Sequence, residues 1–163
     1  MARRPVTAYV ALGANLGAPI VTVRAAIEAL HGLAGARLLS VSSLYRTAPV
    51  GLRDQPDFIN AVAALEVTGS ADDFLAALFA IEASFGRVRG IKNAPRTLDL
   101  DLLLFGAELR DSPGLTLPHP RLIERAFVLA PLAEIAPTLV IDGHGPVAQL
   151  LADVDGQRIE RLP

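Results

Sequence analysis

Two aspartates, Asp99 and Asp101, stand one residue apart in the apolar segment TLDLDLLLFG. On a β-strand, residues two apart point to the same face and lie about 6.5–7 Å apart along the chain. Two carboxylates at that spacing can hold one Mg²⁺ between them, or two ions about 3.5–4 Å apart. The surrounding leucines indicate a largely buried strand, where close carboxylates repel unless a cation compensates them. The pair therefore predicts a magnesium site; an exposed strand face with two solvated aspartates is the simpler alternative.

A basic segment lies directly before this pair. Arg87, Arg89, Lys92 and Arg96 fall between residues 87 and 96. Such a loop beside a metal site suits a triphosphate. Each guanidinium group can bind two phosphate oxygens and can stabilise the negative charge that develops on them during transfer. A solvated basic loop is the alternative. Nucleic-acid binding is disfavoured, because the chain has few aromatic residues for base stacking.

Two weaker signals lie elsewhere in the chain. His119 is flanked by prolines in LPHPR, with Arg125 about one helical turn further on, and both could bind phosphate. Phe58 and Asn60 would share one face of a strand, where a ring and an amide could stack on and hydrogen-bond to a flat heterocycle. Both have a structural alternative, because a lone histidine is often structural and Phe58 could belong to the core.

The hydrophobic pattern predicts the elements that position these residues. Strands are expected over residues 7–12, 37–45, 58–67 and 97–105. A first helix should begin at Pro19 and end at Gly32, and a second should begin after an N-cap at Ser70 and end at Gly86. Further on, we expect a return strand near Leu109 and a short helix over 121–126. A helical turn from residue 131, a hairpin at 142–143 and a helix over 147–154 should follow.

The order β-α-β-β-α-β predicts an α+β fold with a ferredoxin-like βαββαβ core, an antiparallel sheet with helices on one face, and C-terminal elaborations. No linker or repeat interrupts the sequence, so residues 1–163 are expected to form a single domain. The spaced glycines of LGANLG match neither phosphate-loop pattern, so a Rossmann or P-loop fold is not predicted.

Composition limits the function classes. The chain has 52% apolar residues and a net charge of -2, which is typical of a globular protein without a global attraction to nucleic acid or an anionic membrane. It contains no cysteine, which excludes disulfides and thiolate metal sites. No apolar run approaches the roughly 20 residues of a membrane span, so a cytoplasmic protein is expected.

Taken together, six segments resemble the 6-hydroxymethyl-7,8-dihydropterin pyrophosphokinase family of folate biosynthesis. They are YVALGANLG, SSLYRTAPVG, DQPDFINAVAALE, FGRVR, PRTLDLDLLLFG and LPHPRLIERAFVLAPLAEIAP. The resemblance implies a magnesium-dependent monomer that binds two Mg²⁺ ions and uses ATP as co-substrate. It also implies the reaction: pyrophosphate passes as a unit from ATP to the hydroxymethyl group of the pterin, and AMP is released.

The same resemblance implies roles for individual residues. The catalytic set would be Arg87, Arg96, Asp99 and Asp101, of which Asp99 and Asp101 would hold the metal. ATP would contact Glu82, Arg89, Leu102, Thr116, His119 and Arg125. The pterin would contact Thr47, Ala48, Val50, Phe58, Asn60 and Phe127, with its ring between the two phenylalanines. The sequence departs from the family pattern at Phe79 and Gly114, both on the nucleotide side.

Two other function classes fit parts of the pattern. One is a ferredoxin-like sensor that binds a nucleotide or pterin without turnover, although a sensor has no need of arginines clustered beside paired carboxylates. The other is an ATP-dependent transferase that acts on a different acceptor. Release of AMP only in the presence of the hydroxymethyl pterin would distinguish the three.

Overall fold

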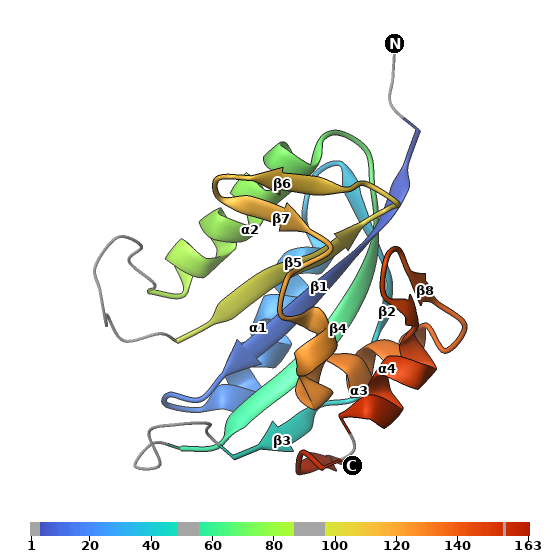
Figure 1. Ribbon diagram of the computed structural model, residues 1–163. Helices are drawn as coiled ribbons and strands as arrows, with labels where there is room; N and C mark the ends of the chain where they lie inside the picture. Colours follow the sequence, from blue (N-terminus) through green and yellow to red (C-terminus); the bar gives the residue numbers. More distant parts are fainter. Residues whose placement is uncertain (1–3, 49–55, 87–96, 155) are drawn as a thin grey trace.

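The computed structural model describes residues 4–48, 56–86, 97–154 and 156–163. These residues form a six-stranded antiparallel sheet in the order β10-β3-β4-β1-β5, with β2 also paired to β4 (Figure 1). The strands are β1 (Val6–Ala14), β2 (Ala36–Val41), β3 (Tyr45–Thr47), β4 (Phe58–Val67), β5 (Asp99–Phe105) and β10 (Ile159–Arg161). The part β2-β4-β1-β5 has the predicted ferredoxin-like arrangement.

Two helices cover one face of this sheet (Figure 1): α1 (Pro19–His31) and α2 (Ala71–Ser84). Both begin as predicted, because Pro19 occupies the first turn of α1 and the Ser70 hydroxyl accepts a hydrogen bond from the Asp73 amide at 3.0 Å. Gly86 follows α2 with a φ of 90°, a conformation that favours glycine. Leu30 and Leu78 from these helices pack against the alternate positions of β1, β4 and β5.

The C-terminal helices cover part of the opposite face. The helices α3 (Ala126–Ile135) and α4 (Val147–Asp153) form a second apolar cluster, in which Val62 of β4 packs with Leu129 and Leu132. One face of the sheet is therefore covered by α1 and α2. The other face is covered in part by α3 and α4, and the rest of it is open. None of the helices in the described part of the chain is both long and apolar enough to cross a membrane.

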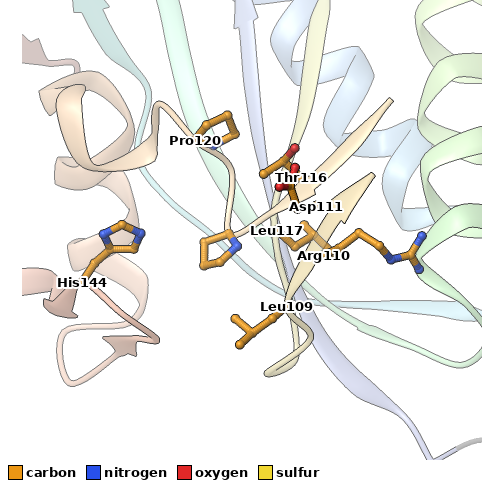
Figure 2. A pocket seen from close by; sticks show the side chains of 8 residues that line it. Leu109, Arg110, Asp111, Thr116, Leu117, Pro120 and His144 are labelled. Carbon is orange, nitrogen blue, oxygen red and sulfur yellow. The ribbon is translucent and has the colours of Figure 1, made fainter. Parts of the chain in front are cut away.

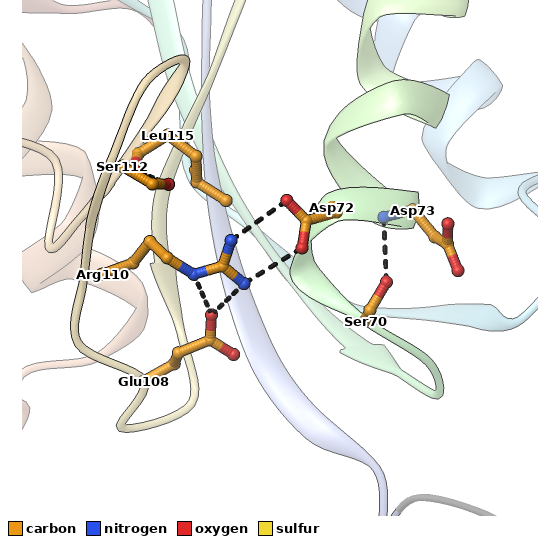
Figure 3. A network of polar contacts seen from close by, with 7 residues as sticks. All are labelled: Ser70, Asp72, Asp73, Glu108, Arg110, Ser112 and Leu115. Atoms are coloured by element: carbon orange, nitrogen blue, oxygen red, sulfur yellow. Dashed lines mark hydrogen bonds and ion pairs between the residues drawn. The ribbon is translucent and has the colours of Figure 1, made fainter.

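Two small hairpins and a short 3-10 turn complete the fold. They are β6 (Arg110–Ser112) with β7 (Leu115–Leu117), β8 (Val140–Ile141) with β9 (Gly145–Pro146), and η1 (Leu122–Glu124). The first hairpin is fastened to α2, because the Arg110 guanidinium donates to both carboxylate oxygens of Asp72 at 3.1 and 3.0 Å and to Glu108 at 2.8 Å (Figure 3). After the hairpin, the His119 amide donates to the Leu103 carbonyl at 2.9 Å, which places this segment beside β5.

The single strand predicted over residues 37–45 is wrong, because the chain forms two strands there. Between β2 and β3, the Ser42 amide donates to the Val62 carbonyl at 2.9 Å, and the Ser42 hydroxyl accepts from the Val62 amide at 2.9 Å. A side-chain oxygen thus takes the place of a main-chain acceptor, which interrupts the regular ladder. Both strands nevertheless pair with β4.

The C-terminal part also differs from the prediction. The helix expected over 121–126 is only the turn η1, and the turn expected from Pro131 is instead the ten-residue helix α3, which runs through Pro131. A proline within a helix removes one hydrogen bond, here to the Phe127 carbonyl. Burial of Val128, Leu129 and Leu132 outweighs that loss. Strand β10, which extends the sheet beyond β3, was not predicted.

A carboxylate ties α3 to the strand edge at β3. Glu134 accepts hydrogen bonds from the Ser43 amide at 2.9 Å and from the Tyr45 hydroxyl at 2.7 Å, and Arg161 lies 3.6 Å away. Burial alone would raise the pKa of Glu134, but these donors and the arginine outweigh it and hold the pKa below its ordinary 4.5. Burial and the bond to Glu134 raise the pKa of Tyr45 to about 12.

Replacing Glu134 by glutamine should therefore destabilise the fold in a pH-dependent way. We expect a loss of about 1–3 kcal/mol in the free energy of unfolding at about pH 7, because at least one buried donor loses its acceptor. Since the pKa of Glu134 is lowered by folding, its contribution is fully present above 4.5 and is lost as the pH falls through the lower, folded value.

Urea unfolding at about pH 7 and about pH 3.5 tests this, and the gap between wild type and Glu134→Gln should narrow at the lower pH. The control is Glu66→Gln, because Glu66 forms an exposed pair with Arg37 at 3.4 Å. It should change stability by no more than about 1 kcal/mol. A gap for Glu134→Gln that does not depend on pH would contradict the assignment.

Candidate active site

The register of the sheet brings predicted site residues into adjacent rows on one face. In the central row Tyr45, Asn60, Gly13 and Asp99 lie opposite one another across β3, β4, β1 and β5. On one side of it Thr47 lies opposite Phe58, and on the other Val62, Ala11 and Asp101 are aligned. Residues directly opposite in a sheet point to the same face, so the predicted pterin residues and the aspartate pair share one surface.

Asp99 and Asp101 point away from the helices α1 and α2. Both are half-buried, whereas the alternating residues Leu98, Leu100 and Leu102 are buried in the core beneath those helices. The strand thus separates its carboxylates from its leucines with the period of two that was predicted. An irregularity in the pairing with β1 then places Leu103 and Leu104 together in the second apolar cluster, which explains the unbroken apolar run after Asp101.

Asn60 is held in a defined orientation. Its side chain is 6% exposed, and its amide nitrogen donates to the Thr47 hydroxyl at 2.9 Å. The adjacent Phe58 is half-buried at the start of β4, and Ala48 is exposed just beyond β3. Ring, amide and hydroxyl therefore come together at this end of the strand pair, on the face predicted from the alternation in β4.

His119 lies between the aspartates and the C-terminal helices. Its amide donates to the Leu103 carbonyl at 2.9 Å, and its ring nitrogen Nδ1 accepts from the Arg121 amide at 3.2 Å. Burial lowers the pKa of His119 below its ordinary 6.5; the Asp101 charge opposes this shift, and Arg125 and Arg121 add to it. The lowered pKa favours the neutral ring, and because Nδ1 accepts a hydrogen bond, the neutral ring carries its proton on Nε2, where it can donate.

Arg125 and Phe127 meet at the start of α3. The Arg125 guanidinium lies over the Phe127 ring, 5.4 Å from its centroid, in a cation–π contact. One of these residues was predicted to bind ATP and the other the pterin. Because α3 packs on β4, the two predicted subsites adjoin at this point of the fold.

Thr116 belongs to strand β7 of the first hairpin. It lines an open depression of about 620 Å³ between the β6–β7 hairpin and His144 (Figure 2). Asp111 lies opposite Thr116 in the hairpin, and Pro118 and Pro120 flank His119 in the same wall. Of the predicted site residues that the structure describes, this depression includes Thr116 alone.

Two predicted ATP contacts have side chains that are closed to solvent. Leu102 is 3% exposed and packs in the core under α1 and α2. Glu82 is 1% exposed, and its carboxylate accepts a hydrogen bond from the Leu100 amide at 2.8 Å. Strand β5 is at the edge of the sheet, so Glu82 binds a main-chain group between the two aspartates. Their predicted contact with ATP stays a prediction.

Four predicted residues lie outside the described part of the chain: Val50, Arg87, Arg89 and Arg96.

Gly13 was not among the predicted site residues, although it lies in the central row between Asn60 and Asp99. The glycines of LGANLG were the available signal, but they were compared only with phosphate-loop patterns. The strand register reveals their position.

The aspartate pair fits a magnesium ion by its donor chemistry. Magnesium prefers one or two carboxylates and completes its octahedron with water and substrate phosphate oxygens. Among the described residues, three or more His, Cys, Asp or Glu side chains nowhere gather into a metal-binding group. Two half-buried carboxylates on one strand face correspond to this sparse mode of binding.

Comparison with known proteins identifies relatives along nearly the whole chain. A model of the 7,8-dihydro-6-hydroxymethylpterin-pyrophosphokinase family matches residues 9–137. The chain is 49% identical over 155 residues to the 2-amino-4-hydroxy-6-hydroxymethyldihydropteridine pyrophosphokinase of Pseudomonas aeruginosa, covering 95% of this chain and 96% of that protein. The Haemophilus influenzae protein of the same name is 40% identical over 157 residues, covering 96% of this chain and 98% of that protein.

The fold also matches solved structures. The crystal structure of wild-type Plasmodium falciparum HPPK-DHPS with pteroate superposes with a TM-score of 0.74, over 94% of this chain and 43% of that one. The sequence identity is 12%, so this match concerns the fold alone.

Proposed function

Because the chain belongs to the 7,8-dihydro-6-hydroxymethylpterin-pyrophosphokinase family, we propose that it transfers pyrophosphate from ATP to the hydroxymethyl group of 6-hydroxymethyl-7,8-dihydropterin in folate biosynthesis. The hydroxymethyl oxygen bonds to the β-phosphorus of ATP and its proton is released, so that the products are the pterin pyrophosphate, AMP and a proton. The bond from that phosphorus to the α-phosphate oxygen breaks, and AMP leaves.

One structural observation carries the proposal: a buried, oriented amide and a pair of carboxylates occupy the same sheet face, two strands apart. Neighbouring strands lie about 4.7–4.9 Å apart, so Asn60 and Asp99 are separated by about 10 Å across β1. That span suits a two-ring heterocycle read at one end and phosphorylated at the other. Because Asn60 and Asp99 lie on the same face, the sheet itself fixes the distance between the residue that would bind the pterin edge and the residue that would hold the metal.

On the acceptor side, Asn60 would read the polar edge of the pterin while Thr47 holds the amide from behind. An amide presents both a donor and an acceptor, which the amide edge of a pterin matches in pairs. Phe58 and Phe127 would contact the ring faces, and Arg125 would leave the Phe127 ring when the pterin stacks there. Ala48 and Val50 would line the rim.

On the donor side, Asp99 and Asp101 would hold magnesium. When bound, Mg²⁺ would screen the negative charge of the triphosphate. We propose two ions, as the family resemblance implies, and the spacing of the two carboxylates along the strand can accommodate a pair. His119 would donate from Nε2, and Arg125 would add a cation. Thr116 is assigned to ATP as well, with Arg89 as a phosphate-binding residue and Arg87 and Arg96 as the catalytic arginines.

The exclusion of water is the remaining requirement, because water would compete with the pterin hydroxyl for the β-phosphorus. His119 and the oriented Asn60 would bring the two substrates together. Positioning and charge compensation therefore account for most of the proposed rate enhancement.

The test is to measure the nucleotide product. With MgATP and the hydroxymethyl dihydropterin, we expect AMP and the pterin pyrophosphate in equal amounts, and neither product when the pterin is omitted. ADP in place of AMP would indicate a simple kinase. Binding of both substrates without AMP would indicate a sensor, and AMP formed with other acceptors would indicate a different transferase.

A further inference from the structure

We infer that Gly13 is a positioning residue of the acceptor site, which acts by leaving the Asn60 amide undisturbed. This inference rests on the pterin site proposed above. It concerns a residue that makes no contact through a side chain and that the LGANLG motif presented only as one of several spaced glycines.

The first observation is the place of Gly13 in the sheet. It is buried near the end of β1, directly opposite Asn60 on one side and Asp99 on the other. A side chain at this position would point to the same face as both neighbours. Gly13 therefore stands between the residue assigned to read the pterin and the residue assigned to hold the metal.

The second observation is steric. A Cβ atom built on Gly13 would lie 3.0 Å from Oδ1 of Asn60, which is tighter than ordinary van der Waals contacts. The opposite end of that amide is fixed, because its nitrogen donates to the buried Thr47 hydroxyl at 2.9 Å. Asn60 cannot turn away from a methyl group at position 13 without weakening this bond.

The third observation concerns the reason for glycine. The backbone of Gly13 is not in the left-handed region that favours glycine, and its neighbours in β1 have ordinary strand geometry. Glycine in the interior of a strand weakens the strand and often marks a close approach by another group. The approaching group here is the Asn60 amide. Glycine at position 13 therefore weakens β1 locally but leaves the side chain assigned to the pterin in its orientation.

The test is Gly13→Ala, measured by equilibrium binding of the dihydropterin in the presence of a non-hydrolysable ATP analogue and Mg²⁺. We expect the pterin Kd to rise about tenfold, which corresponds to the loss or distortion of about one hydrogen bond. The KM for ATP and the melting temperature should change little. The control is Gly32→Ala at the C-terminus of α1, where an added Cβ meets only ordinary contacts of 3.8 Å.

A double-mutant cycle separates an action through Asn60 from a structural effect. In an Asn60→Ala background the amide is absent, so Gly13→Ala should cause no further loss of pterin affinity. Equal losses in both backgrounds, or an unchanged pterin Kd in Gly13→Ala alone, would overturn the inference. Failure of the wild-type protein to bind the pterin would instead overturn the proposed function.

Discussion

Replacing Asp101 by asparagine should lower the rate of AMP formation by at least about 10³-fold, because the site loses half of the charge proposed to hold the metal. Asparagine keeps the size of the side chain and one oxygen, so the fold should remain intact. The free energy of unfolding should be unchanged or higher, since one of two neighbouring half-buried charges is removed.

Binding measurements make this prediction specific to the metal. Titration calorimetry should show that Asp101→Asn weakens MgATP binding much more than pterin binding. Addition of EDTA should reduce the affinity of the wild-type protein for ATP toward that of the variant. The matched control is Asp73→Asn, an exposed carboxylate in the first turn of α2 (Figure 3), which should leave both affinities unchanged. Near-normal turnover by Asp101→Asn would remove the metal assignment.

Replacing Asn60 by alanine raises the pterin KM by about 100-fold and leaves MgATP binding unchanged. The change removes a donor and an acceptor from the reading edge, at about 1–1.5 kcal/mol each, and about 1.4 kcal/mol is a tenfold change in affinity. It also removes the amide from which the buried Thr47 hydroxyl accepts a hydrogen bond in the wild-type protein. Stability should therefore fall by about 1 kcal/mol.

A second variant distinguishes reading from packing. Thr47→Val keeps Asn60 but removes the hydroxyl that orients it, so the pterin KM should rise less, by about tenfold. The control is Gln149→Ala, which removes an exposed amide on α4 that bonds to Asp153. A loss confined to ATP binding in Asn60→Ala would mean that the acceptor site has been assigned to the wrong face.

The alternation of residue types predicted the faces of β4 and β5 correctly. In β4 it separated Phe58 and Asn60 from the core residues Ile59 and Ala61, and in β5 it separated the aspartates from the leucines. The caps at Pro19 and Ser70 predicted where both core helices begin. These signals are local, and the residues that carry them are close together in the chain.

The parts that were not predicted depend on contacts between distant segments. Alternation gives the face of a strand but not its register, so the alignment of Gly13 with Asn60 and Asp99 was not available. The break at Ser42 depends on the amide of Val62, and α3 continues through Pro131 because its apolar residues are buried against the sheet. Glu82 is buried because β5 is an edge strand, and the Glu82 carboxylate accepts a hydrogen bond from its Leu100 amide.

The division of the sheet between a packed face and an open face has a consequence for how the protein can change over time. Along β4, neighbouring residues serve different purposes: Ile59 and Ala61 pack in the core, and Asn60 is the residue proposed to bind the pterin. Substitutions that alter substrate preference can therefore accumulate at alternate positions without loss of the core. The limit is Val62, where α3 covers the same face and the residue again serves packing. Along β4, substitutions can therefore change ligand binding only at the positions that α3 does not cover.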